Sequence, residues 1–220
     1  MEAREAKDKL YEAFASTARA LASPKRIEII ELLAQAEYTV EAIAKSTNMT
    51  IANTSAHLKV LKHARIVVAR REGTKIFYKN ASLNVSSLLG SLRELTQSRI
   101  AEVNQVVADY FSTLDAFEPL SRDEFIELTR SREVIVLDVR PELEYTTGHI
   151  PGALSVPLEQ ISAVANSLPK SSLIVAYCRG PFCVLAPQAV DFLTRHGFNS
   201  RRLHDGMPEW RLAGFPVEVS

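Results

Sequence analysis

Residues 172–196, SLIVAYCRGPFCVLAPQAVDFLTRH, carry the strongest fold signal of this chain. The run Ser172–Tyr177 is short, apolar and β-prone, which is typical of a strand buried on both faces in a parallel sheet. It leads directly into Cys178, and a helical pattern follows from Val184 to His196, with Gly197 as its stop. A cysteine at the carboxyl end of a central parallel strand lies where ligands bind in such sheets.

The chain before this segment also alternates short apolar strands with helical stretches. Ser121 and Glu124 form a capping box that starts a helix. Two strands are expected at Val134–Leu137, which ends at Asp138, and at Leu154–Val156. A further helix is expected at Leu158–Leu168. This order predicts an α/β domain with a parallel central sheet over residues 116–220.

The loop after the central strand has the composition of an anion-binding turn. Backbone amides and the following helix N-terminus stabilise a thiolate, so we expect the pKa of the Cys178 thiol to fall. Pro181 has no N–H, and the expected donors are the amides of Arg179, Gly180, Phe182, Cys183 and Val184. A buried, inert cysteine is the alternative, although it fits poorly beside Arg179 and Gly180.

Cys178 and Cys183 are the two cysteines of the sequence, which excludes a disulfide framework and a four-cysteine zinc site. Cys183 has two possible roles. It is either a resolving thiol for chemistry on Cys178 or a small residue that fills the last position of the loop. The residues alone leave both open.

Composition describes an ordinary globular chain: 220 residues, 46% hydrophobic and 24% charged, with zero net charge. No apolar run reaches the roughly eighteen residues of a membrane span. The N-terminus, MEAREAKDKL, is charged and lacks the apolar core of a signal peptide. We therefore expect a cytoplasmic protein without a membrane partner.

A change of pattern near Asp115–Ser121, with Pro119 as a breaker, predicts a boundary between domains 1–115 and 116–220. Just before it, apolar residues recur at helical spacing from Val85 to Leu114, about 45 Å of helix. Such a helix either packs within one protomer or pairs with the first helix, whose apolar face begins at Leu10, in a homodimer. We favour the homodimer because a small domain leaves most of that length uncovered.

Residues 24–79 have the order of an α+β winged helix-turn-helix domain. A short helix is expected over Val40–Lys45, and Thr50 is placed to cap the next helix, which runs to about Ala64. Two β-prone runs, Ile66–Arg71 and Lys75–Lys79, then flank a polar turn and predict a hairpin. In such a unit the second helix enters the major groove and the tip of the hairpin reaches the adjacent backbone or minor groove.

Charge supports a polyanion surface on this unit. Residues 45–79 contain eight lysines and arginines against one acid, Glu72. A solvated basic helix face is the alternative. The candidate DNA-binding residues are Thr50, Asn53, Ser55, His57, Lys59, Arg70, Arg71 and Lys75.

The segments ASPKRIEIIELL, TSAHLKVLKHARIV and RREGTKIFY resemble winged-helix repressors of the ArsR family over residues 8–80. The resemblance implies a homodimer that occupies a double-stranded DNA operator and releases it with an inducer. Metal-sensing members carry a Cys-x-Cys in the third helix or His and Asp ligands in the last. TVEAIAK has no cysteine and residues 91–114 have no histidine, so no metal site is expected, and His57 and His63 point to different faces.

The blocks LDVRPELEYTTGHIPGA, YCRGPFC and LHDGMPEWRLAGFPV resemble rhodanese sulfurtransferases over residues 118–218. The resemblance implies that Cys178 carries a persulfide. It gives scaffold roles to Asp138, Arg140, His149 and Trp210. Relatives that act on phosphate or arsenate have a longer loop with arginine six positions after the cysteine, where this chain has Val184. The expected ligand is thus a small sulfur donor, namely thiosulfate, a persulfide or a polysulfide, without a cofactor.

The combined prediction is a transcriptional regulator whose rhodanese domain senses or transfers sulfane sulfur. Two alternatives remain at this stage. One is a sulfurtransferase that uses its winged domain for dimerisation or targeting. The other is an arsenic- or metal-responsive repressor, which the missing ligands disfavour.

Overall fold

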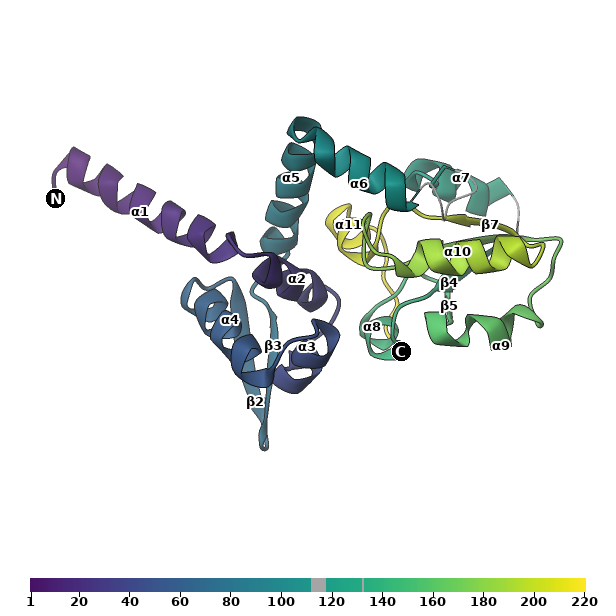
Figure 1. Ribbon diagram of the computed structural model, residues 1–220, viewed down its shortest axis with the longest axis horizontal. Coiled ribbons are helices and arrows are strands. Elements are labelled where there is room, and N and C mark those ends of the chain that lie inside the picture. Colours follow the sequence, from purple (N-terminus) through teal and green to yellow (C-terminus); the bar gives the residue numbers. More distant parts are fainter. Residues whose placement is uncertain (112–117, 132) are drawn as a thin grey trace. The chain divides into compact units, whose positions relative to one another are not determined.

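The computed structural model describes residues 1–111, 118–131 and 133–220 (Figure 1). The chain separates into two compact units, Met1–Ser91 and Leu92–Ser220. The predicted boundary at Asp115–Ser121 falls partly on residues 112–117, which lie outside the described residues. No helix in the described ranges combines the length and the apolar character that crossing a bilayer requires.

The first unit is a winged helix-turn-helix, as predicted. Its elements are α1 (Ala3–Leu21), α2 (Pro24–Leu33), β1 (Tyr38–Thr39), α3 (Val40–Ser46), α4 (Ile51–His63), β2 (Val67–Glu72), β3 (Lys75–Asn80) and the start of α5 (Leu83–Arg99). The strands form an antiparallel sheet in the order β1-β3-β2. Thr39 and Thr50 cap α3 and α4, because their hydroxyls accept the amides of Ala42 and Asn53 at 3.3 and 3.2 Å.

The core of this unit lies between α2, α3 and α4. The predicted stripe on α4, Thr54, Leu58 and Leu61, is buried. It faces Ile30 and Ile43, which are also buried, and each such side chain contributes about 1.5 to 3 kcal/mol by leaving water. This packing fixes the helix-turn-helix and leaves the other face of α4 exposed.

The prediction of one helix from Val85 to Leu114 is wrong over the described residues, and its last part, 112–114, lies outside them. The structure has α5 ending at Arg99 and α6 (Ala101–Phe111) beginning after Ile100. The Thr96 and Ser98 hydroxyls donate to the carbonyls of Leu92 and Leu95 at 2.7 and 3.0 Å. Hydroxyls that bond back to the preceding turn bend and weaken helices, which explains a break that the apolar spacing did not reveal.

The second unit is built on a four-stranded parallel sheet, which confirms the α/β prediction. Its strands are β4 (Val134–Asp138), β5 (Leu154–Ser155), β6 (Leu173–Tyr177) and β7 (Asn199–Arg202), in the order β5-β4-β6-β7. The carboxyl ends of β4 and β6 are neighbours, since Asp138 pairs with Tyr177. Cys178 follows at once, at this edge of the sheet.

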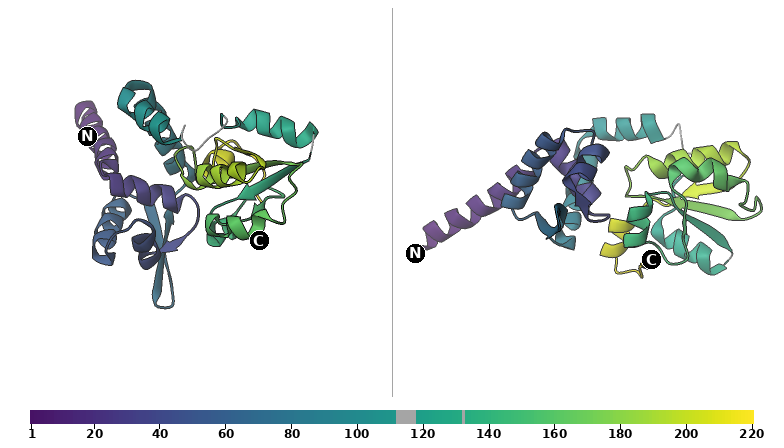
Figure 2. Two further views of the ribbon diagram at one scale, coloured as in Figure 1. Left: turned by 45° about the vertical axis from the view of Figure 1, so that its right-hand side comes forward. Right: turned by 90° about the horizontal axis from the view of Figure 1, so that it is seen from below.

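Helices cover both faces of this sheet (Figure 2). The helical elements are α7 (Arg122–Ser131), α8 (Glu142–Thr147), the 3₁₀ turn η1 (Leu158–Gln160), α9 (Ile161–Ala165), α10 (Leu185–Arg195) and α11 (Met207–Leu212). Apolar residues of α9 and α10 form one core against the sheet, and those of α7 and α11 form the other. The capping box is present, because the Ser121 amide donates to Glu124 at 2.8 Å and the Glu124 amide donates back to Ser121 Oγ at 3.3 Å.

Three elements of this unit have no counterpart in the sequence-based prediction. Strand β7 has the polar sequence NSRR, although Ser200 and Arg202 are buried. Helices α8 and α11 have only six residues each, which is too short for a clear apolar period. These short elements support the loop that carries Cys178.

Candidate functional site

Cys178 lies at the bottom of a short loop between β6 and α10. Its side chain belongs to the apolar core on the α10 side, and the residue is only 3% exposed. The loop turns tightly because the Cys183 amide donates to the Gly180 carbonyl at 3.1 Å. This turn brings Cys183, which is half-buried, back toward Cys178.

The two thiols of the loop interact directly. The Cys178 thiol donates to the Cys183 carbonyl oxygen at 3.6 Å. The Cys178 thiol, together with the backbone amides of Leu185 and Arg179, lowers the pKa of Cys183 to about 7. Burial and the neighbouring Cys183 raise the pKa of Cys178 well above its ordinary value.

This result is opposite to the fall in the Cys178 pKa that the sequence predicts. The physical reason is that the loop holds two sulfurs, and the first negative charge resides on the less buried one. The amides of Gly180 and Ala186 face Cys178, and those of Arg179 and Leu185 face Cys183. Two of the five expected donors, Arg179 and Gly180, therefore reach a sulfur.

The remaining expected donors are placed differently. The Cys183 amide is used inside the turn, and Val184 precedes the first residue of α10 with an exposed side chain. Phe182 is half-buried beside it. The amides that complete the sulfur environment, Leu185 and Ala186, belong to the first turn of α10, where backbone N–H groups are free to bind an anion.

A buried carboxylate anchors the loop from the side. Arg179 Nε donates to both oxygens of Glu144 at 3.0 and 3.1 Å, and its terminal nitrogen donates to Oε1 at 2.6 Å. Glu144, on α8, is completely buried. A bidentate pair of this kind holds the backbone of Arg179, and therefore the position of its amide, in one geometry.

Gly206 packs closely against the backbone of the loop that follows Cys178. A Cβ atom at this position would lie 2.3 Å from both the carbonyl carbon of Arg179 and the amide of Gly180. Only a residue without a side chain allows the α11 N-terminus this close to the loop. Glu209, one turn along α11, accepts the Gly206 amide at 3.1 Å, and burial raises its pKa.

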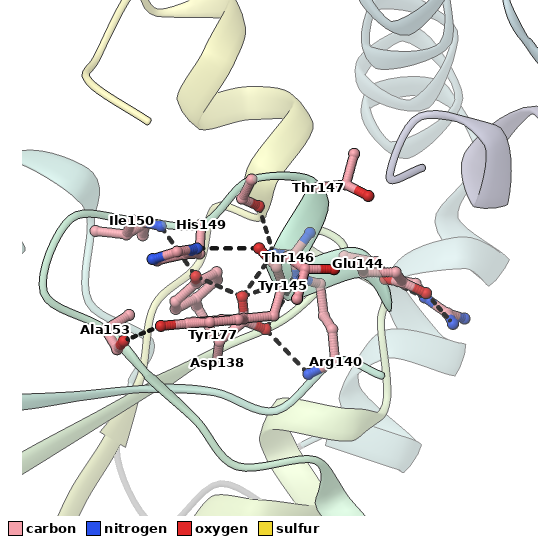
Figure 3. A network of polar contacts seen from close by, with 12 residues as sticks. Asp138, Arg140, Glu144, Tyr145, Thr146, Thr147, His149, Ile150, Ala153 and Tyr177 are labelled. Carbon is pink, nitrogen blue, oxygen red and sulfur yellow. Dashed lines mark hydrogen bonds and ion pairs between the residues drawn. The ribbon is translucent and has the colours of Figure 1, made fainter. Parts of the chain in front are cut away.

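A buried polar network lies at the end of β4 beside the site (Figure 3). Asp138 accepts the backbone amide and Nε of Arg140 at 3.0 and 2.9 Å, and the Tyr177 hydroxyl at 2.6 Å. The Tyr177 oxygen in turn accepts the Ile150 amide at 3.0 Å. Burial and the Asp138 charge raise the pKa of Tyr177, so its phenol stays protonated and acts as a donor.

The other expected scaffold residues are also held in place. His149 stacks on Tyr145, with ring centroids 3.7 Å apart, and its Nδ1 lies 3.0 Å from the Tyr145 carbonyl oxygen. Trp210 Nε1 donates to the Pro216 carbonyl at 2.7 Å. Besides the amides of Leu185 and Ala186, sequence reasoning missed Glu144, Tyr177 and Gly206, whose roles depend on contacts between distant segments.

The candidate DNA-binding residues lie on the exposed face of α4 and on the hairpin. On α4, Asn53, Ser55 and Lys59 are exposed and His57 is half-buried, while the Thr50 hydroxyl serves as the helix cap. This is the face that the buried stripe leaves free. No contact within the described residues assigns these side chains a structural role other than the cap.

The wing residues differ from one another. Arg70 pairs with Glu37 and Glu72 and lies over the Phe77 ring, with its guanidinium carbon 4.6 Å from the centroid. Arg71 Nε donates to the Gly73 carbonyl at 3.0 Å near the tip of the hairpin. Lys75 starts β3 on the exposed side. Arg70 is therefore committed to contacts within the chain, whereas Arg71 and Lys75 extend from the tip.

Across residues 1–111, 118–131 and 133–220, no group of three His, Cys, Asp or Glu side chains is placed to hold a metal ion. His57 and His63 both lie on α4, six positions apart.

The sequence matches two protein-family models. Residues 121–213 match the rhodanese-like domain, and residues 23–68 match the bacterial regulatory protein, arsR family. These ranges coincide with the α/β unit and with the helix-turn-helix.

Individual relatives match either almost the whole chain or one of its two units. The HTH-type transcriptional regulator Rv0324 of Mycobacterium tuberculosis is 40% identical over 209 residues, which is 95% of this chain and 92% of the relative. A sulfurtransferase of Allochromatium vinosum is 30% identical over 91 residues, 41% of this chain and 83% of that protein. Among solved structures, the homodimeric winged helix-turn-helix domain of Mb0332 from Mycobacterium bovis is 37% identical over 46% of this chain and 91% of that one, with a TM-score of 0.42.

The relative that matches almost end to end extends over both units, and the two family models divide the chain in the same way as the fold. The chain therefore belongs to the ArsR family of HTH-type transcriptional regulators and carries a C-terminal rhodanese-like domain.

Proposed function

We propose that this regulator binds a double-stranded operator as a homodimer, takes up one sulfane sulfur on Cys178, and loses operator affinity as a result. The proposal that Cys178 takes up sulfur rests on one observation. Cys178 lies at the carboxyl end of β6, and the amides of Gly180 and Ala186 face its sulfur. The donor is a small molecule such as thiosulfate, a persulfide or a polysulfide.

The loop amides support a mechanism for this uptake. The amides of Gly180 and Ala186 favour the charged form of Cys178, whose proton is lost to water. The Cys178 thiolate attacks the sulfane sulfur of the donor and keeps it as a persulfide, while the rest of the donor leaves as sulfite, a thiolate or a shorter polysulfide. The loop amides then stabilise the added sulfur, which carries negative charge.

The size of the loop favours sulfur over a tetrahedral oxyanion. Six residues, Cys178–Cys183, separate β6 from the helical turn at Val184. Val184 occupies the place where an oxyanion-binding loop would have an arginine, and it offers no charge. Arg179, the cation next to Cys178, is bound to Glu144 instead.

The DNA-binding part rests on α4 and the hairpin. Exposed Asn53, Ser55 and Lys59 line the free face of α4, as a recognition helix requires. Arg71 and Lys75 at the hairpin tip provide phosphate contacts, which position the protein without reading sequence.

The homodimer rests on apolar side chains of α1 and α5. Leu10, Tyr11 and Phe14 of α1 are 57%, 56% and 63% exposed, and Leu88 of α5 is 46% exposed. A second copy of this chain would bury this surface at about 25 cal/mol per Å². Size-exclusion chromatography with light scattering tests it, since Phe14→Glu should give a monomer and the neighbouring exposed change Glu12→Lys should not.

Sulfur uptake is tested by mass spectrometry of the full chain after exposure to inorganic polysulfide. Uptake should add about 32 Da, one sulfur atom, to the Cys178 peptide of a Cys183→Ser variant. No such gain should occur in Cys178→Ser. Absence of the gain in Cys183→Ser, or its presence on Cys183 in Cys178→Ser, would overturn the assignment.

A second candidate function is a sulfurtransferase in which the winged unit serves for dimerisation or targeting. The intact Cys178 loop and the likeness to a sulfurtransferase over 91 residues favour it. Steady-state turnover with thiosulfate and a thiol acceptor separates the two functions. Multiple turnover with unchanged operator affinity would support the enzyme.

A further inference from the structure

We propose that Cys183 is the resolving thiol of this site, which converts a sulfur-loaded Cys178 into a Cys178–Cys183 disulfide and expels hydrogen sulfide. This inference rests on the proposed function, because it needs the persulfide on Cys178. With a resolving thiol, the loop does more than carry sulfur. Sulfane sulfur oxidises its two thiols to a disulfide, so the loop acts as a redox switch.

Geometry is the first argument. The turn closed by the Cys183 amide and the Gly180 carbonyl folds the end of the loop back onto its beginning. As a result the Cys178 thiol donates to the Cys183 carbonyl oxygen at 3.6 Å, so its sulfur lies against the backbone of the residue that carries the second thiol. A disulfide needs its two β-carbons about 3.5 to 4.5 Å apart, and a turn that already brings one sulfur to the backbone of the other cysteine leaves little backbone movement to meet this condition.

The difference between the two cysteines is the second argument. Cys183 is half-buried, whereas Cys178 is 3% exposed. Besides the Cys178 thiol, the backbone amides of Arg179 and Leu185 lower the pKa of the Cys183 thiol, and a thiol that is partly ionised at neutral pH is a good attacking group. These two amides remain in place when Cys178 is loaded. Cys183 therefore retains its own anion-stabilising groups when Cys178 is loaded.

The reaction balances without an external oxidant. The Cys183 thiolate attacks the Cys178 sulfur, the bond between the two cysteines forms, and the bond from Cys178 to the outer sulfur breaks. The outer sulfur takes one proton from water as it leaves and departs as the hydrogen sulfide anion. The outer sulfur is reduced by two electrons, which the two cysteine sulfurs supply together as they become a disulfide. A dithiol reductant then restores both thiols and becomes a disulfide itself.

The disulfide changes the loop more than a persulfide does. It removes the negative charge that Gly180, Ala186, Arg179 and Leu185 stabilise, and it ties Cys183 to the end of β6. Because Cys183 lies two residues before Leu185, the first residue of α10, the new bond acts on the start of that helix. The signal therefore persists after the sulfur has left, until a dithiol resets it.

The experiment uses the full chain, reduced and freed of reductant without air, with one equivalent of sulfane sulfur added as inorganic polysulfide. Free thiols are then alkylated, and the mass of the intact protein is measured by mass spectrometry. The wild type should carry no alkyl group on either cysteine and should weigh about 2 Da less than the dithiol form, the mass of two hydrogens. Cys183→Ser should instead keep the gain of about 32 Da on Cys178. Excess dithiol should return the wild type to two free thiols.

The outcomes separate this inference from the proposed function. A wild type that retains the same stable gain of about 32 Da as Cys183→Ser overturns the resolving role and leaves sulfur uptake intact. A Cys183→Ser variant that gains nothing overturns sulfur uptake, and the resolving role with it. Transfer of the added sulfur to Cys183 in the wild type, with Cys178 left as a free thiol, also overturns the resolving role.

Discussion

The Arg179 guanidinium binds the buried carboxylate of Glu144 through two nitrogens, at 2.6 to 3.1 Å. This pair joins the loop that carries Cys178 to α8, a helix 35 positions earlier in the chain. The backbone amide of Arg179 is one of the donors that face Cys183. An ion pair formed by the residue next to Cys178 thus determines where a sulfur-binding amide points.

Loss of this pair should destabilise the second unit. Glu144→Ala leaves the Arg179 charge without its partner, and removing one partner of a buried pair costs about 3 to 5 kcal/mol. Urea unfolding followed by the fluorescence of Trp210, the single tryptophan of the sequence, measures this cost in the rhodanese-like domain. Glu142→Ala, an exposed change on the same helix, is the control and should change the free energy of unfolding by less than about 0.5 kcal/mol. Equal effects of the two changes would contradict the anchoring role.

Gly206→Ala should disrupt the loop and sulfur uptake together. The new Cβ would lie 2.3 Å from the backbone of Arg179 and Gly180, which has to move. We expect the gain of sulfur on Cys178 to be lost or strongly slowed. Gly90→Ala is the matched control, because no heavy atom lies within 4 Å of a Cβ there. Normal sulfur uptake by Gly206→Ala would show that the loop tolerates this displacement.

The reactivity of Cys183 should depend on pH with a midpoint near 7. Because the pKa of Cys183 is lowered to about 7, its thiolate is present above this pH and is lost as the pH falls through it. The rate of iodoacetamide labelling, followed peptide by peptide, reports this titration. In Cys178→Ala the donating thiol is removed without a substitute donor, and the midpoint should move up toward the ordinary thiol value of about 8.5. A midpoint that stays near 7 in that variant would rule out the thiol pair as the cause.

The wing residues should differ in their effect on DNA binding. Arg71→Ala and Lys75→Ala should weaken binding to any duplex and reduce the slope of log affinity against log salt by about one unit per lost phosphate contact. Arg70→Ala should change this slope less, because Arg70 pairs with Glu37 and Glu72. Fluorescence anisotropy with a random duplex at several salt concentrations measures all three. An unchanged slope for Arg71→Ala and Lys75→Ala would contradict the wing assignment.

Sequence reasoning predicted those parts of the fold that depend on local signals. The Thr50 cap, the Ser121/Glu124 capping box and the stripe of Thr54, Leu58 and Leu61 are all confirmed. Each of these depends on residues at most seven positions apart. The helix break at Ile100 was missed because apolar spacing continues through it, whereas the cause is hydrogen bonding by Thr96 and Ser98.

The sequence predicted where Cys178 lies in the fold, but it did not predict which residues surround it. A cysteine after a buried strand placed Cys178 correctly at the end of β6. The partners that decide its chemistry, Glu144 on α8 and Gly206 before α11, come from segments 34 and 28 positions away. Likewise the lowered pKa of Cys183 depends on how the loop amides divide between two sulfurs, which spacing alone does not reveal.

The most direct test of the regulatory account is operator affinity before and after sulfur uptake. The operator is first selected from a random duplex pool, and the full chain is then titrated at one fixed salt concentration, untreated and after polysulfide, with uptake verified by mass. Allosteric coupling of the usual size, about 1 to 3 kcal/mol, predicts a loss of affinity of about 5- to 150-fold in the wild type and none in Cys178→Ser. An unchanged affinity in wild-type protein that has verifiably reacted at Cys178 would contradict the account.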